Sequence, residues 1–176
     1  MGAVLALVCG CGSSAVAATP GSSRSDTPST VVPVVASTNV YGDIARQVGG
    51  DHVKVVSIIN DSAQDPHSYE ASTQNRLALS EAKVVVENGG GYDDFIDRML
   101  DGTKNSSPTV INAVQVSGRA AQEGTDLNEH VWYDFSAMGK LADRIAAALA
   151  KASPGAAAVF LQHAKSFKDR LTALEG

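Results

Sequence analysis

The chain has 176 residues, of which 44% are hydrophobic and 19% charged, and its formal net charge at pH 7 is -5. The apolar fraction is typical of globular proteins and excludes a disordered tail, and the length suits one domain or slightly more. An acidic chain lacks the basic surface that nucleic acids require, and no apolar run reaches the roughly 18 residues of a membrane-spanning helix. A nucleic-acid partner is therefore disfavoured, and a polytopic membrane protein is excluded.

Residues 1–30 are predicted to be a leader followed by a flexible tether. The apolar start gives way to small residues, as in export signals, although no Lys or Arg precedes Val4. Val8-Cys9-Gly10-Cys11 resembles a bacterial lipobox, which predicts lipidation of Cys11; a leader that is simply cleaved, or a spurious one, is the alternative. The segment from Ser13 to about Thr30 is mostly Ser, Ala, Thr, Pro and Gly, a composition typical of linkers. Both cysteines fall in the leader, so the folded part depends on no disulfide.

Short β-branched runs alternate with helical patterns in the rest of the chain. The predicted strands cover residues 31–37, 52–59, 83–87 and 109–111. Helices are predicted where apolar residues recur at helical spacing, at about 38–48, 72–82, 92–100 and 136–150. Residues 60–72 and 112–130 are predicted to be loops. Ser153-Pro154 is predicted to interrupt the Ala-rich helix and to start a final helix that runs to the end of the chain.

This alternation predicts an α/β fold with a parallel sheet of about four strands flanked by helices. In open sheets of this kind, ligands bind outside the carboxyl ends of the strands. The loops near Asn39, His67, Asn88 and His130 are therefore the places where a functional site is expected.

Two histidines, His67 and His130, fall on these loops. Asp65 and Glu70 are close enough in sequence to orient the imidazole of His67, and Glu129 adjoins His130. Imidazole is a common ligand of zinc and of other divalent ions, but two imidazoles cannot complete a tetrahedral site. A metal site would need further ligands, and the simpler alternative is that both histidines are solvated loop residues.

Other candidates have structural explanations. His52 is predicted to be structural, and His163 to lie on a solvated helix face. Gly89-Gly90-Gly91 lacks the spacing of a phosphate-binding loop and is predicted to be a turn. The carboxylates that follow it, Asp93 among them, are predicted to favour a helix dipole and not to form a catalytic pair.

Several segments together resemble the metal-binding class of ABC-transporter solute-binding proteins. The segments cover residues 35–44, 49–51, 64–70, 81–89 and 129–134, in the order found in that family. The D-P-H-x-Y-E motif at residues 65–70 is specific, and a second histidine motif at 129–134 accompanies it. The second motif departs from the usual pattern, because Asn128-Glu129 replaces Asp-Pro before the histidine.

The resemblance implies a Rossmann-like lobe of a two-lobe receptor, with the metal in the cleft between the lobes. It implies that His67 and His130 are the two ligands of the first lobe, supported by Asp65, Glu70 and Glu129. It divides the chain into a leader and tether at 1–30, a metal-binding N-terminal lobe at 31–152, and the start of a long interlobe helix at 153–176. The second lobe, with two further ligands, would lie beyond this sequence.

The resemblance also implies a partner and a location. It predicts a monomer on the extracytoplasmic face of the cell membrane, lipid-anchored or else periplasmic or secreted, that delivers zinc to an ABC permease. Zinc is favoured over manganese by the softness of the histidine ligands, although residues 112–128 contain no histidine-rich insertion. The alternatives are an adhesin-like lipoprotein or a non-functional fragment of the same fold. A metal-dependent hydrolase is less favoured, since only Glu70 or Glu129 is placed to act as a general base.

Overall fold

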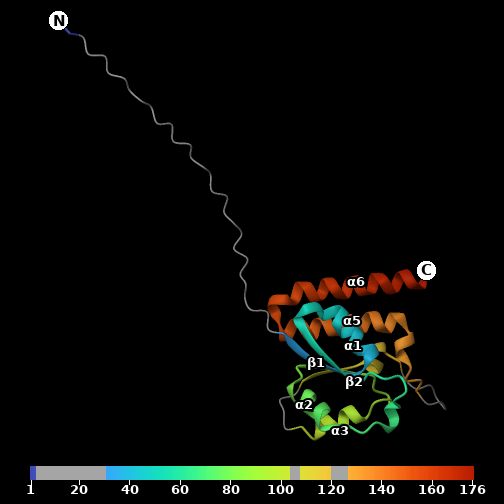
Figure 1. Ribbon diagram of the computed structural model, residues 1–176. Coiled ribbons are helices and arrows are strands. Elements are labelled where there is room, and N and C mark those ends of the chain that lie inside the picture. Colours follow the sequence, from blue (N-terminus) through green and yellow to red (C-terminus); the bar gives the residue numbers. More distant parts are fainter. Residues whose placement is uncertain (3–30, 104–107, 120–126) are drawn as a thin grey trace.

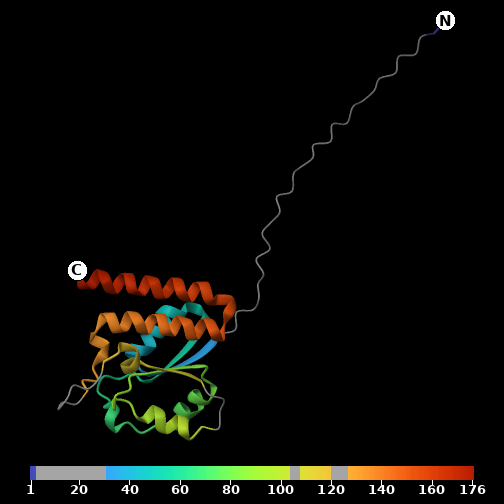
Figure 2. The same ribbon diagram turned by 180° about the vertical axis from the view of Figure 1, so that it is seen from behind.

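The computed structural model describes residues 1–2, 31–103, 108–119 and 127–176. Cys11 and nearly all of the predicted leader and tether lie outside the described residues. The described body has a parallel sheet with helices on both sides (Figures 1 and 2). None of its helices carries an apolar stretch long enough to cross a membrane.

The sheet has four strands in the order β2-β1-β3-β4, and each neighbouring pair is parallel. The strands are β1 (Val32–Thr38), β2 (Val53–Ile59), β3 (Val84–Glu87) and β4 (Thr109–Asn112). Val34 of β1 lies between Val55 of β2 and Val84 of β3. The two central strands, β1 and β3, are almost entirely buried, because helices cover both faces of the sheet. Successive side chains, which point to opposite faces, are therefore mostly apolar on both. The predicted fold class is confirmed.

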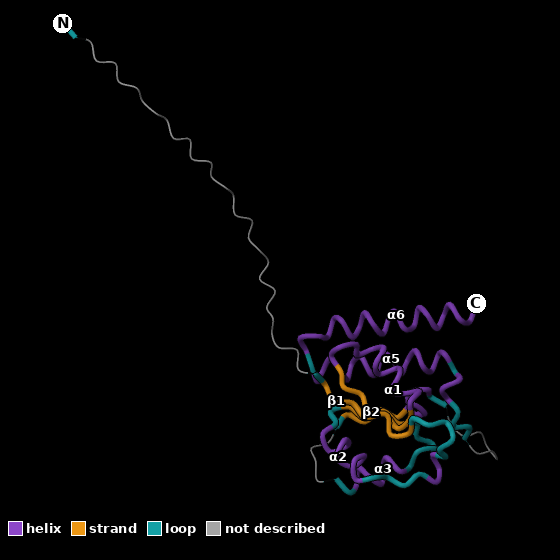
Figure 3. The backbone as a smooth tube through the Cα atoms, in the orientation of Figure 1, coloured by secondary structure: helices purple, strands orange, loops and turns teal. Residues whose placement is uncertain are grey.

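The helices lie on both sides of the sheet (Figures 1 and 3). α1 and α5 lie over one face, with α6 packed outside them, and α2 and α3 cover the other face. Their bounds are α1 (Asn39–Gly49), α2 (Thr73–Glu81), α3 (Phe95–Asp101), α5 (Phe135–Ala152) and α6 (Ala157–Glu175). The final helix is preceded by the 3-10 turn η4 (Pro154–Ala156), which agrees with the predicted break at Ser153-Pro154.

Each face of the sheet has its own hydrophobic cluster. On the α1–α5–α6 face, the fully buried side chains include Leu141, Ile145 and Phe160. The α2–α3 face has a smaller cluster around Leu79 and Phe95. The sheet therefore has a thickly covered face and a thinly covered one, and these are called the α1–α5–α6 face and the α2–α3 face below.

The predicted loop at 112–130 contains a helix that the sequence analysis missed. α4 (Ala113–Ser117) begins where the side chain of Asn112 accepts a hydrogen bond from the Gln115 amide at 3.0 Å. It ends at Gly118, whose φ of 76° is the left-handed conformation that glycine favours at helix ends. The capping signal was present, but the helix is too short to give a clear periodicity.

The predicted surface position of His163 is wrong. Its ring is half-buried against α1, and Nδ1 lies 3.1 Å from the carbonyl oxygen of Val48. A carbonyl oxygen only accepts hydrogen bonds, so Nδ1 carries the proton and donates it. His163 thus connects α6 to the end of α1.

Candidate metal centre

The loops at the carboxyl edge of the sheet bring His67, Tyr92 and His130 together. His67 lies on the 3-10 turn η2 (Pro66–Ser68) after β2, Tyr92 follows β3, and His130 precedes the 3-10 turn η3 (Val131–Tyr133). The ring centroid of Tyr92 is 5.5 Å from that of His67 and 6.2 Å from that of His130, with the planes steeply inclined in both pairs. The rings of the two predicted ligands therefore both lie next to the ring of Tyr92.

The backbone around His67 is fixed by Asp65. Its carboxylate accepts hydrogen bonds from the Ser68 hydroxyl at 2.8 Å and from the His67 amide at 3.1 Å. These bonds, that from Ser68 most strongly, lower the pKa of Asp65 below its usual value. Behind the turn, the ring of Tyr69 lies 4.9 Å from that of Phe95, in the cluster of the α2–α3 face. Asp65 thus positions the main chain at His67, and the imidazole is held by another residue.

The imidazole of His67 pairs with Glu129. Nε2 of His67 lies 3.2 Å from Oε1 of Glu129, and the two side chains are 52% and 19% exposed. A carboxylate oxygen only accepts, so Nε2 carries a proton in this arrangement and donates it. Glu129 is next to His130 in sequence but contacts the other histidine. Glu70 makes no hydrogen bond or ion pair with His67 in the described part of the chain, although both line a cavity of about 480 Å³ beside α2 and α3.

The imidazole of His130 is oriented by Asn128, which the sequence analysis did not single out. Oδ1 of Asn128 accepts the His130 amide at 3.0 Å and lies 3.0 Å from Nδ1 of the ring. The bond to the amide identifies this atom as the oxygen, so Nδ1 must be the ring donor, and the lone pair of Nε2 is left exposed. The next residue, Val131, is fully buried in the cluster of the α1–α5–α6 face. In the neutral ring, Nε2 of His130 is therefore the nitrogen available to a metal ion.

A buried polar network lies beneath the two histidines. The Tyr41 hydroxyl donates to Oδ1 of Asn88, and Nδ2 of Asn88 donates to the carbonyl oxygen of Glu129 at 3.0 Å. The carboxylate of Asp93 accepts the amides of Asn88 at 2.7 Å and Gly89 at 2.8 Å. Burial raises the pKa of Tyr41 and of Asp93. Asp93, predicted only to favour a helix dipole, instead ties the loop after β3 to the end of that strand.

The glycine run at 89–91 is the predicted turn, and its first residue must be glycine. Gly89 has a φ of 76°, and a Cβ there would lie 2.0 Å from Nδ2 of Asn112. The same Nδ2 donates to Oε1 of Glu87 at 2.8 Å. Burial raises the pKa of Glu87 to about 7, with the Asn112 hydrogen bond opposing the rise. The loop after β3 can therefore pass this close to Asn112 of β4 only because residue 89 has no side chain.

The site offers two imidazoles and one nearby carboxylate. Among the residues that the structure describes, no three His, Cys, Asp or Glu side chains form a group that could hold a metal ion. Two neutral imidazoles can bind a divalent transition metal while leaving other coordination positions open.

Comparisons with known proteins identify the family to which the chain is similar. The family described as zinc-uptake complex component A, periplasmic (ZnuA), matches residues 34–176. The manganese-binding lipoprotein MntA of Bacillus subtilis is 33% identical over 147 residues, which are 81% of this chain and 47% of that protein. A crystal structure of ZnuA has a TM-score of 0.72 at 25% identity, covering 82% of this chain and 56% of that one. The nickel complex of FpvC from P. aeruginosa has a TM-score of 0.71 at 27% identity, covering 81% and 52%. The chain spans about half the length of these relatives.

Proposed function

Because the chain belongs to the family of periplasmic zinc-uptake components called ZnuA, we propose that it captures a divalent metal ion for an ABC transporter. This family consists of substrate-binding proteins and not of enzymes, so the hydrolase alternative is set aside. The observation that carries the proposal is that the rings of His67 and His130 both lie next to Tyr92 at the carboxyl edge of the sheet.

The metal ligands in this proposal are the Nε2 atoms of His67 and His130. Nε2 of His130 is ready to bind, because the proton of that ring is on Nδ1, beside Asn128. Nε2 of His67 carries the proton that it donates to Glu129, so metal binding at this atom requires the neutral ring to change tautomer and to carry its proton on Nδ1. The carboxylate of Glu129, which then loses its hydrogen bond, would remain beside the ion.

The metal that this site prefers follows from its donor atoms. Nitrogen and oxygen sites generally bind zinc more tightly than manganese among the divalent first-row metals. We therefore expect zinc to bind more tightly than manganese, although several relatives, MntA of Bacillus subtilis among them, are described as proteins that bind or transport manganese. Two imidazoles leave coordination positions to water or to other donors, so the affinity of this chain should be micromolar or weaker.

The cellular setting is also a proposal. A lipid on Cys11 would hold the domain at the extracytoplasmic face of the membrane, with the tether between them, and the monomeric receptor would pass its ion to a permease. The lipobox-like segment in the sequence and the description of the MntA relative as a lipoprotein support this setting.

Zinc titration of the full chain by isothermal calorimetry tests the proposal. His67→Ala and His130→Ala should each weaken zinc binding by about tenfold or more, since each removes one ligand. His163→Gln is the matched control, because it removes an imidazole from α6 while its amide can still donate to Val48.

Two outcomes would overturn the ligand assignment. One is that the double variant lacking His67 and His130 binds zinc as tightly as the unaltered chain. The other is that His163→Gln weakens binding as much as the substitutions at the site.

A further inference from the structure

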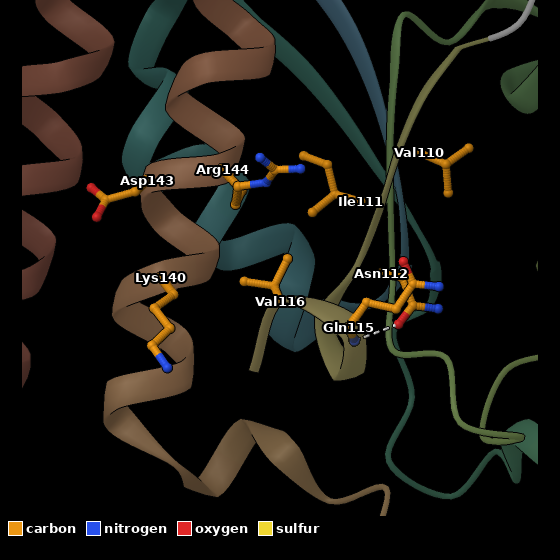
Figure 4. Close-up of a pocket in the computed structure, with 8 residues that line it drawn as sticks. All are labelled: Val110, Ile111, Asn112, Gln115, Val116, Lys140, Asp143 and Arg144. Atoms are coloured by element: carbon orange, nitrogen blue, oxygen red, sulfur yellow. Dashed lines mark hydrogen bonds between the residues drawn. The ribbon is translucent and has the colours of Figure 1, made fainter. Parts of the chain in front are cut away.

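A cavity of about 600 Å³ lies where β4, α4 and α5 meet, away from the two histidines (Figure 4). Its volume is in the range of small-molecule sites, roughly 300 to 1,000 Å³. β4 is an edge strand of the described sheet. On α4, Gln115 and Val116 line the cavity, whereas Val114 is buried beside the Gly90 loop. The short helix therefore separates the cavity from the loop that carries Tyr92.

Two cationic side chains of α5, one helical turn apart, border this cavity. The guanidinium of Arg144 points towards Ile111 (Figure 4). No described residue forms an ion pair or hydrogen bond with Arg144. Lys140 makes one long contact, from Nζ to the carbonyl oxygen of Ser117 at 3.4 Å. Like charges at this helical spacing repel each other, and a bound anion would relieve the repulsion.

The acidic side chain at this cavity does not neutralise these cations. Asp143 points away from the cavity, towards α6 (Figure 4). Its carboxylate pairs there with Nζ of Lys168 at 2.7 Å. The cavity therefore keeps an excess of positive charge in a chain whose formal net charge is -5.

The wall opposite the cations is apolar. Ile111 is buried, Val116 is half-buried, and Val110 on the outer side of β4 is 42% exposed. Gln115 and Asn112 both line the cavity. The side-chain amide of Asn112 already donates to Glu87 and accepts from the Gln115 backbone amide, so Gln115 supplies the polar group that a ligand could reach. The cavity thus combines a cationic side, an apolar side and one polar group.

We propose that this cavity binds a small organic anion with a single carboxylate and an apolar body. Arg144 holds the carboxylate through two parallel hydrogen bonds, the geometry in which guanidinium and carboxylate groups match. The apolar body lies against Ile111 and Val116, and Lys140 adds positive potential at the other end. This inference is independent of metal binding, because no residue of the cavity contacts either histidine in the hydrogen bonds and ring contacts described above.

Octanoate is a suitable probe, with 1-octanol as the uncharged analogue of the same chain length. Amide chemical shifts of the full, metal-depleted chain should be followed by NMR during each titration, so that a zinc–carboxylate complex cannot produce the signal. We expect octanoate to bind with a Kd of about 1 mM or tighter, as its size allows. The shifts should concentrate at Val110, Val116 and Gln115, and 1-octanol should bind at least about tenfold more weakly.

Three variants with the same change in charge identify the cation that matters. Arg144→Gln should weaken octanoate binding by about tenfold, and Lys140→Gln by about threefold, because only Arg144 is bidentate. Lys54→Gln is the matched control, because Lys54 is exposed on β2 at the opposite edge of the sheet, and it should leave binding unchanged. Equal binding of octanoate and 1-octanol, full affinity in Arg144→Gln, or shifts centred on another surface would each overturn the proposal.

Discussion

The two faces of the sheet differ in how much buried apolar side chain covers them. The cluster on the α1–α5–α6 face is larger than the cluster on the α2–α3 face. Three long or well-packed helices, with a partly Ala-rich interface between α5 and α6, exclude solvent on the first face. Two short helices and a smaller cluster do so on the second. Each histidine of the candidate metal centre is close in sequence to one of the two clusters, since His130 precedes buried Val131 and His67 lies two residues before Tyr69. We therefore expect the segment of His130, beside the larger cluster, to unfold locally less often than the segment of His67, beside the smaller one.

The largest expected effect comes from truncating a leucine on each face. Leu141 and Leu79 are both buried, the first on the α1–α5–α6 face and the second on the α2–α3 face. Leu141→Ala should lower the free energy of unfolding by about 4 kcal/mol, and Leu79→Ala by about 2 kcal/mol, because the thinner layer can collapse around the cavity. Urea denaturation of both variants measures the difference. Equal losses would show that the two faces are packed alike.

A buried carboxyl group on the thin face should make stability depend on pH. Alternation along β3 puts Glu87 on the same side as Val85, facing α3. Its pKa rises from 4.5 to about 7 on folding. The folded chain then holds this proton more tightly than the unfolded chain, so stability should fall by about 3 kcal/mol as pH rises from about 4.5 to about 7.

Glu87→Gln isolates this effect, because the amide oxygen can still accept the hydrogen bond from Asn112. The variant should be about 3 kcal/mol more stable than the unaltered chain at pH 8, and of similar stability at pH 4.5. Urea denaturation at several pH values provides the comparison. Parallel pH profiles for the two proteins would exclude Glu87 as the source.

The connection between α1 and the loop of Glu129 should have a smaller effect. Tyr41→Phe removes the hydroxyl that donates to Asn88 and leaves a buried amide oxygen without this partner. The free energy of unfolding should fall by about 1.5 kcal/mol. Because Asn88 also holds the Glu129 carbonyl, zinc binding should weaken as well. Thermal denaturation measures the loss of stability, and calorimetric titration measures the zinc affinity. If the variant is destabilised but binds zinc as tightly as the unaltered chain, the buried network does not support the site.

The smallest effect is expected on the outer surface of α6. Lys165 pairs with Asp169 at 2.7 Å, but both side chains are mostly exposed, at 73% and 62%. Lys165→Ala should change the free energy of unfolding by less than about 0.5 kcal/mol, as is usual for solvated pairs. A larger loss by thermal denaturation would mean that this surface of α6 is not simply solvated.

The fold was predictable because its elements have strong local signals. The apolar runs of β1 and β3 are continuous and rich in valine, as expected for strands buried on both faces. The stripe of α5 contains Leu141 and Ile145 at helical spacing, and both are buried. α4 was missed because five residues are too few to show a period, and His163 was misplaced because its contact with Val48 joins residues far apart in sequence.

The candidate site was only partly predictable, because several of its contacts also join residues far apart in sequence. His67 and His130 could be singled out by motif and by their position after strands. The contact between His67 and Glu129 depends on the packing of two distant loops, and no sequence spacing indicates it. Asn128 lies two residues before His130, and an Asn side chain commonly accepts a hydrogen bond from the backbone amide two residues on. This spacing is a signal that could have identified it. The role of Asp93 beneath the loop needed the three-dimensional structure.

X-ray absorption at the zinc edge, on the zinc-loaded 176-residue chain, tests the central proposal most directly. If His67 and His130 share one ion, the spectrum should show two imidazole groups with zinc–nitrogen distances of about 2.0–2.1 Å, and oxygen donors in the other positions. In His67→Ala or His130→Ala, one imidazole should disappear from the spectrum. A zinc ion with one imidazole or none in the unaltered chain would contradict the account.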